Sequence, residues 1–63
     1  MMVDEKEVLS RVTGRPEEDF IHWSDGSWTV ADNDTKEYIF TKRKTNKYMG
    51  YLGKFNGVHL YYN

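Results

Sequence analysis

The chain has 63 residues, a formal net charge of −1 and no cysteine. A chain of this length forms one small domain, which buries only about 60% of the surface of its unfolded state. With no cysteine and only two histidines, we expect no disulfide, no structural zinc and no other metal or cofactor. No apolar run approaches the ~20 residues of a membrane span, and no signal-peptide pattern is present. We therefore expect a single cytoplasmic domain over residues 1–63 that contacts no membrane.

The first element in chain order is a helix, predicted over about residues 4–13. Asp4 suits the N-cap, and Glu7 lies three residues later, as in a capping box. Gly14 can adopt the left-handed conformation that ends a helix, and Pro16 prevents its continuation. The helix carries a narrow apolar stripe formed by Val8, Leu9 and Val12. Residues 16–19 are expected to form a turn or short loop.

The next signal is Asp25-Gly26, which favours a two-residue type I′ hairpin turn. Pairing about this turn places Trp23 opposite Trp28 and Ile21 opposite Val30. These four apolar residues then share one face of the hairpin, with His22 and Thr29 on the other. This consistent sorting of the two faces supports strands on both sides of the turn.

Three further strands are predicted at residues 37–42, 48–55 and 58–62. Asn56-Gly57 is a second type I′ signal, which pairs Gly53 with Leu60 and Tyr51 with Tyr62. Gly50 and Gly53 are expected where the strand bends or where another group packs against the backbone.

These elements predict an α+β fold: a short N-terminal helix packed on a five-stranded antiparallel β-meander over about residues 20–62. Whether the sheet curls into a small SH3-like barrel is left open. The last strand, residues 58–62, is expected at an edge of the sheet, where a partner or a second copy of the chain can add a strand.

No motif in the chain indicates catalysis. The serines lack a nucleophile-elbow setting, and no residue is spaced to orient either histidine. Asp32 and Asp34 resemble the start of a calcium loop. However, Glu37 and Arg43 occupy the positions where that loop needs glycine and glutamate. We therefore expect a protein that is not an enzyme and has no catalytic residue.

Charge is distributed unevenly along the chain. Residues 1–35 carry three basic and nine acidic side chains, whereas residues 36–63 carry six basic and one acidic. The basic side chains near the strand connection are Lys42, Arg43, Lys44, Lys47 and Lys54. Together with neighbouring aromatics, they suggest a single-stranded nucleic-acid-binding surface, in which lysines neutralise phosphates and rings stack on bases. Lysines at strand ends also serve simply to prevent edge-to-edge aggregation.

Protein binding is the function that we favour from the sequence. Ten of the 63 residues are aromatic, which is more than a thin domain needs in its core. The expected contact residues, on and near the sheet face opposite the helix, are Tyr38, Tyr48, Leu52, His59 and Tyr61. The hypothesis is an adaptor or inhibitor of a macromolecular target, with a homodimer through an edge strand as a further option. Mimicry of nucleic acid by the acidic half is a weaker alternative, because helix capping and solvation also explain those carboxylates.

One segment resembles part of a known family. Gly50 to Tyr62, with Leu52-Gly53, Asn56-Gly57-Val58 and the closing Tyr61-Tyr62, resembles a hairpin of tailed-phage capsid subunits. A capsid subunit is several times longer than this chain, so its function is not carried over. The small size and the lack of an enzyme motif are compatible with an accessory protein of a phage or mobile element.

Overall fold

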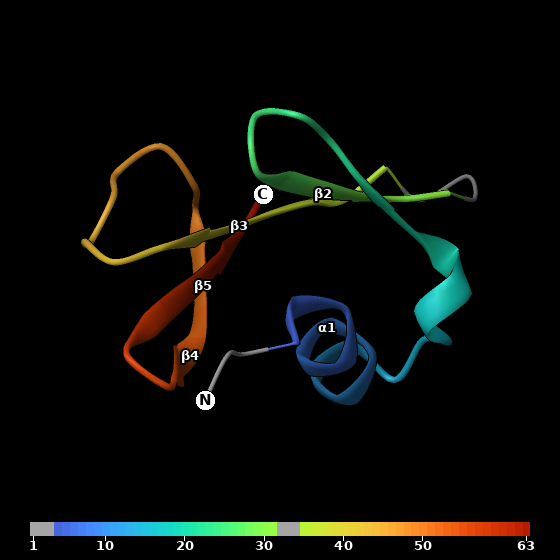
Figure 1. Ribbon diagram of the computed structural model, residues 1–63. Helices are drawn as coiled ribbons and strands as arrows, with labels where there is room; N and C mark the ends of the chain where they lie inside the picture. Colours follow the sequence, from blue (N-terminus) through green and yellow to red (C-terminus); the bar gives the residue numbers. More distant parts are fainter. Residues whose placement is uncertain (1–3, 32–34) are drawn as a thin grey trace.

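The computed structural model describes residues 4–31 and 35–63. The chain begins with helix α1 and the 3₁₀ turn η1, and five strands follow (Figure 1). Their bounds are α1 Glu5–Thr13, η1 Glu17–Asp19, β1 Phe20–His22, β2 Ser27–Val30, β3 Glu37–Thr41, β4 Gly50–Phe55 and β5 Val58–Tyr62. The predicted polar turn at residues 32–36 lies partly outside the described residues.

Helix α1 has the predicted ends, because both are specified locally. The Asp4 carboxylate accepts a hydrogen bond of 3.4 Å from the backbone N–H of Glu7, and Gly14 adopts φ = 77° at the other end. Leu9 is fully buried, and Val8 packs against the same core. The helix therefore presents its apolar stripe to the sheet, as predicted.

The five strands form one antiparallel sheet in the order β1-β2-β3-β5-β4. The predicted α+β fold class, a short helix on a five-stranded antiparallel sheet, is confirmed, but the predicted meander is not followed to its end, because β5 lies between β3 and β4. The sheet curves around α1, which lies on its concave side (Figure 1). It does not close into a barrel, since β1 and β4 are its two edges. The prediction that residues 58–62 form an edge is wrong, because β5 pairs with β3 on one side and with β4 on the other.

The first hairpin is one residue out of the predicted register. Ile21 pairs with Thr29 and His22 with Trp28. The backbone N–H of Trp23 donates to the carbonyl of Ser27, which leaves a turn of three residues, 24–26. The Asp25 carboxylate accepts hydrogen bonds from the backbone N–H (3.0 Å) and the hydroxyl (2.6 Å) of Ser27. These bonds stabilise a turn in which only Gly26 takes a positive φ of 90°, in place of a type I′ turn. Shifting the register by one residue moves a side chain to the opposite face of the sheet.

The second hairpin matches the prediction near its turn and departs from it further along. Asn56 (φ 50°) and Gly57 (φ 85°) form the expected turn, and Gly53 pairs with Leu60. A bulge between Tyr51 and Gly53 then pairs Tyr51 with Tyr61 in place of the predicted Tyr62. The extra residue at this bulge, Leu52, leaves the predicted alternation of faces and packs against the core.

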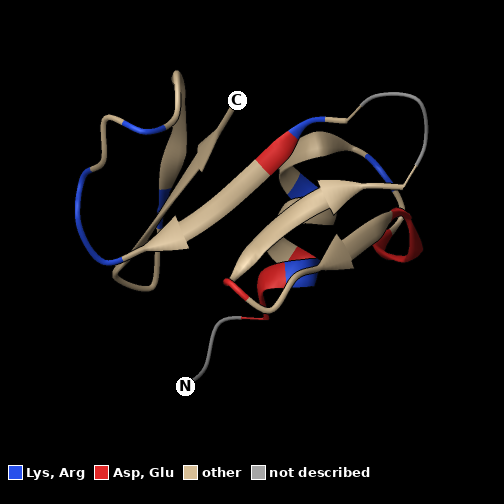
Figure 2. Cartoon of the chain, turned by 90° about the horizontal axis from the view of Figure 1, so that it is seen from above, with Lys and Arg blue, Asp and Glu red and all other residues tan. Residues whose placement is uncertain are grey.

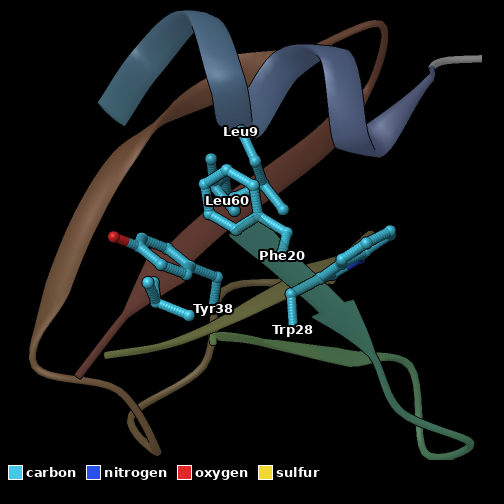
Figure 3. Close-up of a cluster of buried hydrophobic side chains, with 6 residues drawn as sticks. Leu9, Phe20, Trp28, Tyr38 and Leu60 are labelled. Atoms are coloured by element: carbon cyan, nitrogen blue, oxygen red, sulfur yellow. The ribbon is translucent and has the colours of Figure 1, made fainter. Parts of the chain in front are cut away.

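The core lies between α1 and the concave face of the sheet. Its buried members are Leu9, Phe20, Trp28, Val30, Tyr38 and Leu60, five of which are labelled in Figure 3. Leu9 and Leu60 are fully buried. Aromatic rings supply much of the packed volume, and Phe20 and Tyr38 meet edge to face with centroids 6.1 Å apart. The small number of aliphatic residues is therefore sufficient for a core.

Candidate functional site

The convex side of the sheet, turned away from α1, is called the outer face here. Cross-strand register places Ile21, Thr29 and Glu37 in one row of this face, and Ile39 beside Tyr61 in another. Trp23 follows β1, and its indole N–H donates a 2.7 Å hydrogen bond to the Thr29 hydroxyl, which holds the ring on this side. Ile21 is 42% exposed and Trp23 is 50% exposed. The outer face therefore has a pair of exposed apolar side chains at its β1 edge.

A shallow depression of about 390 Å³, largely open to solvent, lies on the outer face beside these residues. We call it the hairpin groove, and its walls are Trp23, Ser24, Asp25, Ser27, Thr29 and Glu37. This volume lies near the lower end of the range of about 300–1,000 Å³ for ligand pockets. Because the hairpin groove is shallow, it does not enclose a cofactor as a ligand pocket does.

Both carboxylates of the hairpin groove are fixed by internal hydrogen bonds. The bonds that Asp25 accepts from the Ser27 hydroxyl and backbone N–H lower the pKa of Asp25, and the charge of Lys47 lowers it further. Glu37 accepts a 2.9 Å hydrogen bond from the Tyr48 hydroxyl. Each carboxylate is thus held in a defined position on the groove wall.

Tyr48 anchors the segment between β3 and β4, residues 42–49, on the outer face. Its side chain is buried although it precedes β4, and its hydroxyl donates to Glu37. Burial, together with this hydrogen bond to a carboxylate, raises the pKa of Tyr48 to about 12. The ammonium of Lys47 lies 5.4 Å from the centroid of the Tyr48 ring. The connection is therefore anchored by an aromatic side chain beside the hairpin groove.

A second group of aromatic side chains lies at the other edge of the outer face. Tyr51 is 50% exposed, its ring centroid lies 5.0 Å from that of Tyr61, and its hydroxyl is 3.0 Å from Nδ1 of His59. Lys54 pairs with His59 across the β4–β5 hairpin. We call Tyr51, His59, Tyr61 and Lys54 the tyrosine patch. Its exposed ring beside a lysine is the arrangement that stacking on an unpaired base needs.

The structure separates the residues predicted to bind protein. Tyr38 and Leu52 belong to the concave side, where Tyr38 is buried in the core and Leu52 packs against it. Tyr48 and Tyr61 lie on the outer side but are each only 5% exposed. His59 alone among the five is both on the outer face and partly exposed. The placement of Leu52 on the outer face is wrong, because the bulge puts Tyr51 opposite Tyr61.

Sequence reasoning missed Ile21 and Trp23 as exposed residues. It placed both with Trp28 and Val30, which are buried, because it assumed a two-residue loop. The signal that was available is the serine after Asp25-Gly26, since an aspartate can cap the residue two positions later.

The basic residues of the alternative prediction gather at one end of the molecule. Lys42, Arg43, Lys44 and Lys47 are exposed on the β3–β4 connection, and Lys54 is exposed on β4. Figure 2 shows this connection at the end opposite the acidic turn η1. The uneven charge along the sequence is therefore also a separation in space.

A second cavity, of about 340 Å³, lies on the concave side between the end of α1 and the sheet. It is lined by Val12, Thr13, Arg15, Lys36, Tyr38, Leu52 and Tyr62. Arg15, Lys36 and Tyr38 also take part in other interactions within the chain.

Comparisons with known proteins found no matching family model, no matching curated protein and no matching solved structure. Within the described residues, no helix is long and apolar enough to cross a membrane. Over the same part of the chain, no three histidine, aspartate or glutamate side chains converge as metal ligands would.

Proposed function

We propose that this chain is a cytoplasmic, non-enzymatic protein-binding module, an adaptor or inhibitor, that contacts its target through the outer face of the sheet. The observation that carries the proposal is the pair Ile21 and Trp23, exposed beside the hairpin groove. Tryptophan is enriched among the residues that dominate binding energy in protein interfaces. An accessory role in a phage or mobile element is one setting for such a module.

The two edge strands of the sheet are poorly suited to pairing with a strand of a partner, which favours contact through the outer face. β1 has only three residues, and β4 carries a bulge and the exposed Lys54. Short strands, bulges and lysines are the features that protect natural sheet edges from pairing. A homodimer through an edge strand is accordingly the weaker form of the proposal.

Affinity capture from a lysate of the source cells, with and without nuclease, tests this function. The bait is compared with two variants, Trp23→Ala and Tyr51→Ala, which remove equally exposed rings from opposite edges of the outer face. We expect one dominant protein to be captured after nuclease treatment, to be lost with Trp23→Ala and to be retained with Tyr51→Ala. A capture that does not distinguish the two variants contradicts the proposal.

Single-stranded nucleic-acid binding is the second candidate, and the tyrosine patch is the observation that favours it. Tyr51 is half exposed and shares the patch with His59 and Lys54, close in sequence to the basic connection. In this case the captured material disappears with nuclease, and Tyr51→Ala rather than Trp23→Ala removes it. The same experiment therefore separates the two functions.

A further inference from the structure

We propose that the hairpin groove receives an arginine side chain of the partner protein. This inference rests on the proposed protein-binding function and specifies the chemistry of the partner. The groove combines an exposed indole, two carboxylates and several hydroxyl groups within about 390 Å³. That combination matches a planar cation that stacks on an aromatic ring and donates several hydrogen bonds.

The aromatic wall of the groove is positioned before any partner arrives. The indole N–H of Trp23 donates to Thr29, and the ring lines the groove while half of its surface stays exposed. Tryptophan gives the strongest cation–π attraction of the aromatic residues, and guanidinium groups favour stacking on it. Because the internal hydrogen bond already restricts the ring, less rotational freedom is lost on binding.

The carboxylates supply charge and hydrogen-bond acceptors. The hydrogen bonds within the chain use Oδ1 of Asp25 and Oε1 of Glu37, whereas an ionised carboxylate accepts through both of its oxygens. Arginine forms bidentate pairs with carboxylates, with two parallel N–H···O hydrogen bonds, which lysine cannot do. The two negative carboxylates repel a negatively charged phosphate, so the groove does not suit a nucleic acid.

Lys47 provides an internal comparison for this electrostatic argument. Its ammonium lies 5.4 Å from the centroid of the Tyr48 ring, and its charge acts on Asp25. A cation of the chain itself is therefore already attracted to this region. An incoming guanidinium competes with Lys47 for the carboxylates. Removing Lys47 should therefore strengthen arginine binding, whereas removing the carboxylate charges should weaken it.

The test is an NMR titration of the ¹⁵N-labelled chain with the probe peptide acetyl-Gly-Ser-Arg-Ser-Gly-amide. The matched control peptide carries citrulline, which has the shape of arginine without its charge. We expect saturable shifts of the Trp23 indole and Thr29 backbone signals with arginine, and affinity at least about fivefold weaker with citrulline. Equal affinity for the two peptides, shifts confined to the tyrosine patch, or no shifts up to about 10 mM peptide would overturn the proposal.

Variants that keep the internal hydrogen bonds show which side chains bind the arginine without disturbing the fold. Asp25→Asn and Glu37→Gln keep an acceptor oxygen for Ser27 and for Tyr48, so the groove keeps its shape. Together they are expected to weaken arginine binding at least about fivefold, whereas Lys47→Ala is expected to tighten it about two- to threefold. If neither change alters affinity, the electrostatic assignment is wrong.

The outcomes distinguish this inference from the function on which it rests. A partner captured from lysate that requires Trp23 but tolerates the Asp25→Asn, Glu37→Gln double variant leaves the function standing and removes the arginine proposal. If no nuclease-resistant partner requires Trp23, the protein-binding function itself fails, whatever the peptide titration gives.

Discussion

The indole N–H of Trp28 donates a 2.9 Å hydrogen bond to Oε1 of Glu5, joining β2 to the first turn of α1. The two residues are 23 positions apart in the sequence. Trp28 is buried and needs a partner for its N–H, while Glu5 lies at the helix end where the dipole favours a negative charge. One carboxylate thus serves both the helix and its contact with the sheet.

Replacing Glu5 by alanine is expected to lower the free energy of unfolding by about 1–2 kcal/mol, because the buried indole loses its charged acceptor. Glu7→Ala is the matched control. Glu7 is another acid of the first turn, but its ion pair with Arg11 is exposed, so we expect a change below about 0.5 kcal/mol. Urea denaturation measures both. Equal losses would mean that the Trp28 contact contributes nothing beyond helix-end charge.

Gly50 is required because the ring of Tyr62 lies against its backbone. A Cβ at position 50 would come within 2.1 Å of a ring atom of Tyr62. We expect Gly50→Ala to lower the free energy of unfolding by about 2 kcal/mol or more. At Gly26 a Cβ meets nothing within 4 Å and only the positive φ opposes it, so Gly26→Ala should cost about 1 kcal/mol.

A double-mutant cycle checks the cause assigned at Gly50. Tyr62→Leu removes the ring, so Gly50→Ala should cost clearly less in that background than in the natural chain. The same cost in both backgrounds would assign the effect to the backbone alone.

Removing either of two buried tyrosine hydroxyls is expected to change the free energy of unfolding in opposite directions. The Tyr48 hydroxyl donates to Glu37, whereas the Tyr61 hydroxyl is buried with no hydrogen-bond partner in residues 4–31 and 35–63. Tyr48→Phe should therefore lower the free energy of unfolding by about 1–2 kcal/mol. Tyr61→Phe should leave it unchanged or raise it by up to about 1 kcal/mol, because an unpaired buried polar group is removed. Thermal or urea unfolding of the two variants decides the signs.

Stability at high pH gives a further test of Tyr48. Its pKa in the fold, about 12, exceeds the usual value of 10.0, so the folded chain holds this proton more tightly than the unfolded chain does. The stabilisation from this group is complete below pH 10 and is lost as the pH rises from 10 toward 12, by about 2 kcal/mol or less. The natural chain should therefore lose stability more steeply than Tyr48→Phe between pH 9 and about 11.5. Parallel curves would exclude the raised pKa.

The basic connection is tested through the salt dependence of nucleic-acid binding. If the second candidate function holds, affinity for a fluorescent single-stranded oligonucleotide falls steeply with salt. Lys42→Ala with Lys44→Ala then reduces the slope of log affinity against log salt by about one to two. Under the protein-binding account, affinity is weak at physiological salt and Tyr51→Ala does not change it. Fluorescence anisotropy at several salt concentrations gives the slope directly.

The helix and the Asn56-Gly57 turn were predictable because their signals are local. Asp4 and Gly14 specify the helix ends whatever the remainder of the chain does, and Asn56 and Gly57 both take the positive φ that their turn needs. The strand positions followed from the apolar pattern in the same way. Local chemistry was therefore sufficient for the fold class.

The face of each strand was less predictable, because one residue of loop or bulge reverses it. The side-chain bonds of Asp25 to Ser27 lengthen the first loop, which moves Ile21 and Trp23 to the outer face. The bulge next to Gly53 does the same for Tyr51. The three exposed apolar residues of the candidate site, Ile21, Trp23 and Tyr51, were displaced in this way, which explains why the sequence alone did not point to them.

The outer face is tested most directly by calorimetric titration of the captured partner protein into the natural chain and into Trp23→Ala and Tyr51→Ala. These variants remove equally exposed rings from its two edges. The protein-binding account predicts that Trp23→Ala weakens the dissociation constant by at least about thirtyfold, as expected for a dominant tryptophan contact, and that Tyr51→Ala changes it less than about threefold. Unchanged affinity with Trp23→Ala, or an equal loss with both variants, would contradict the account.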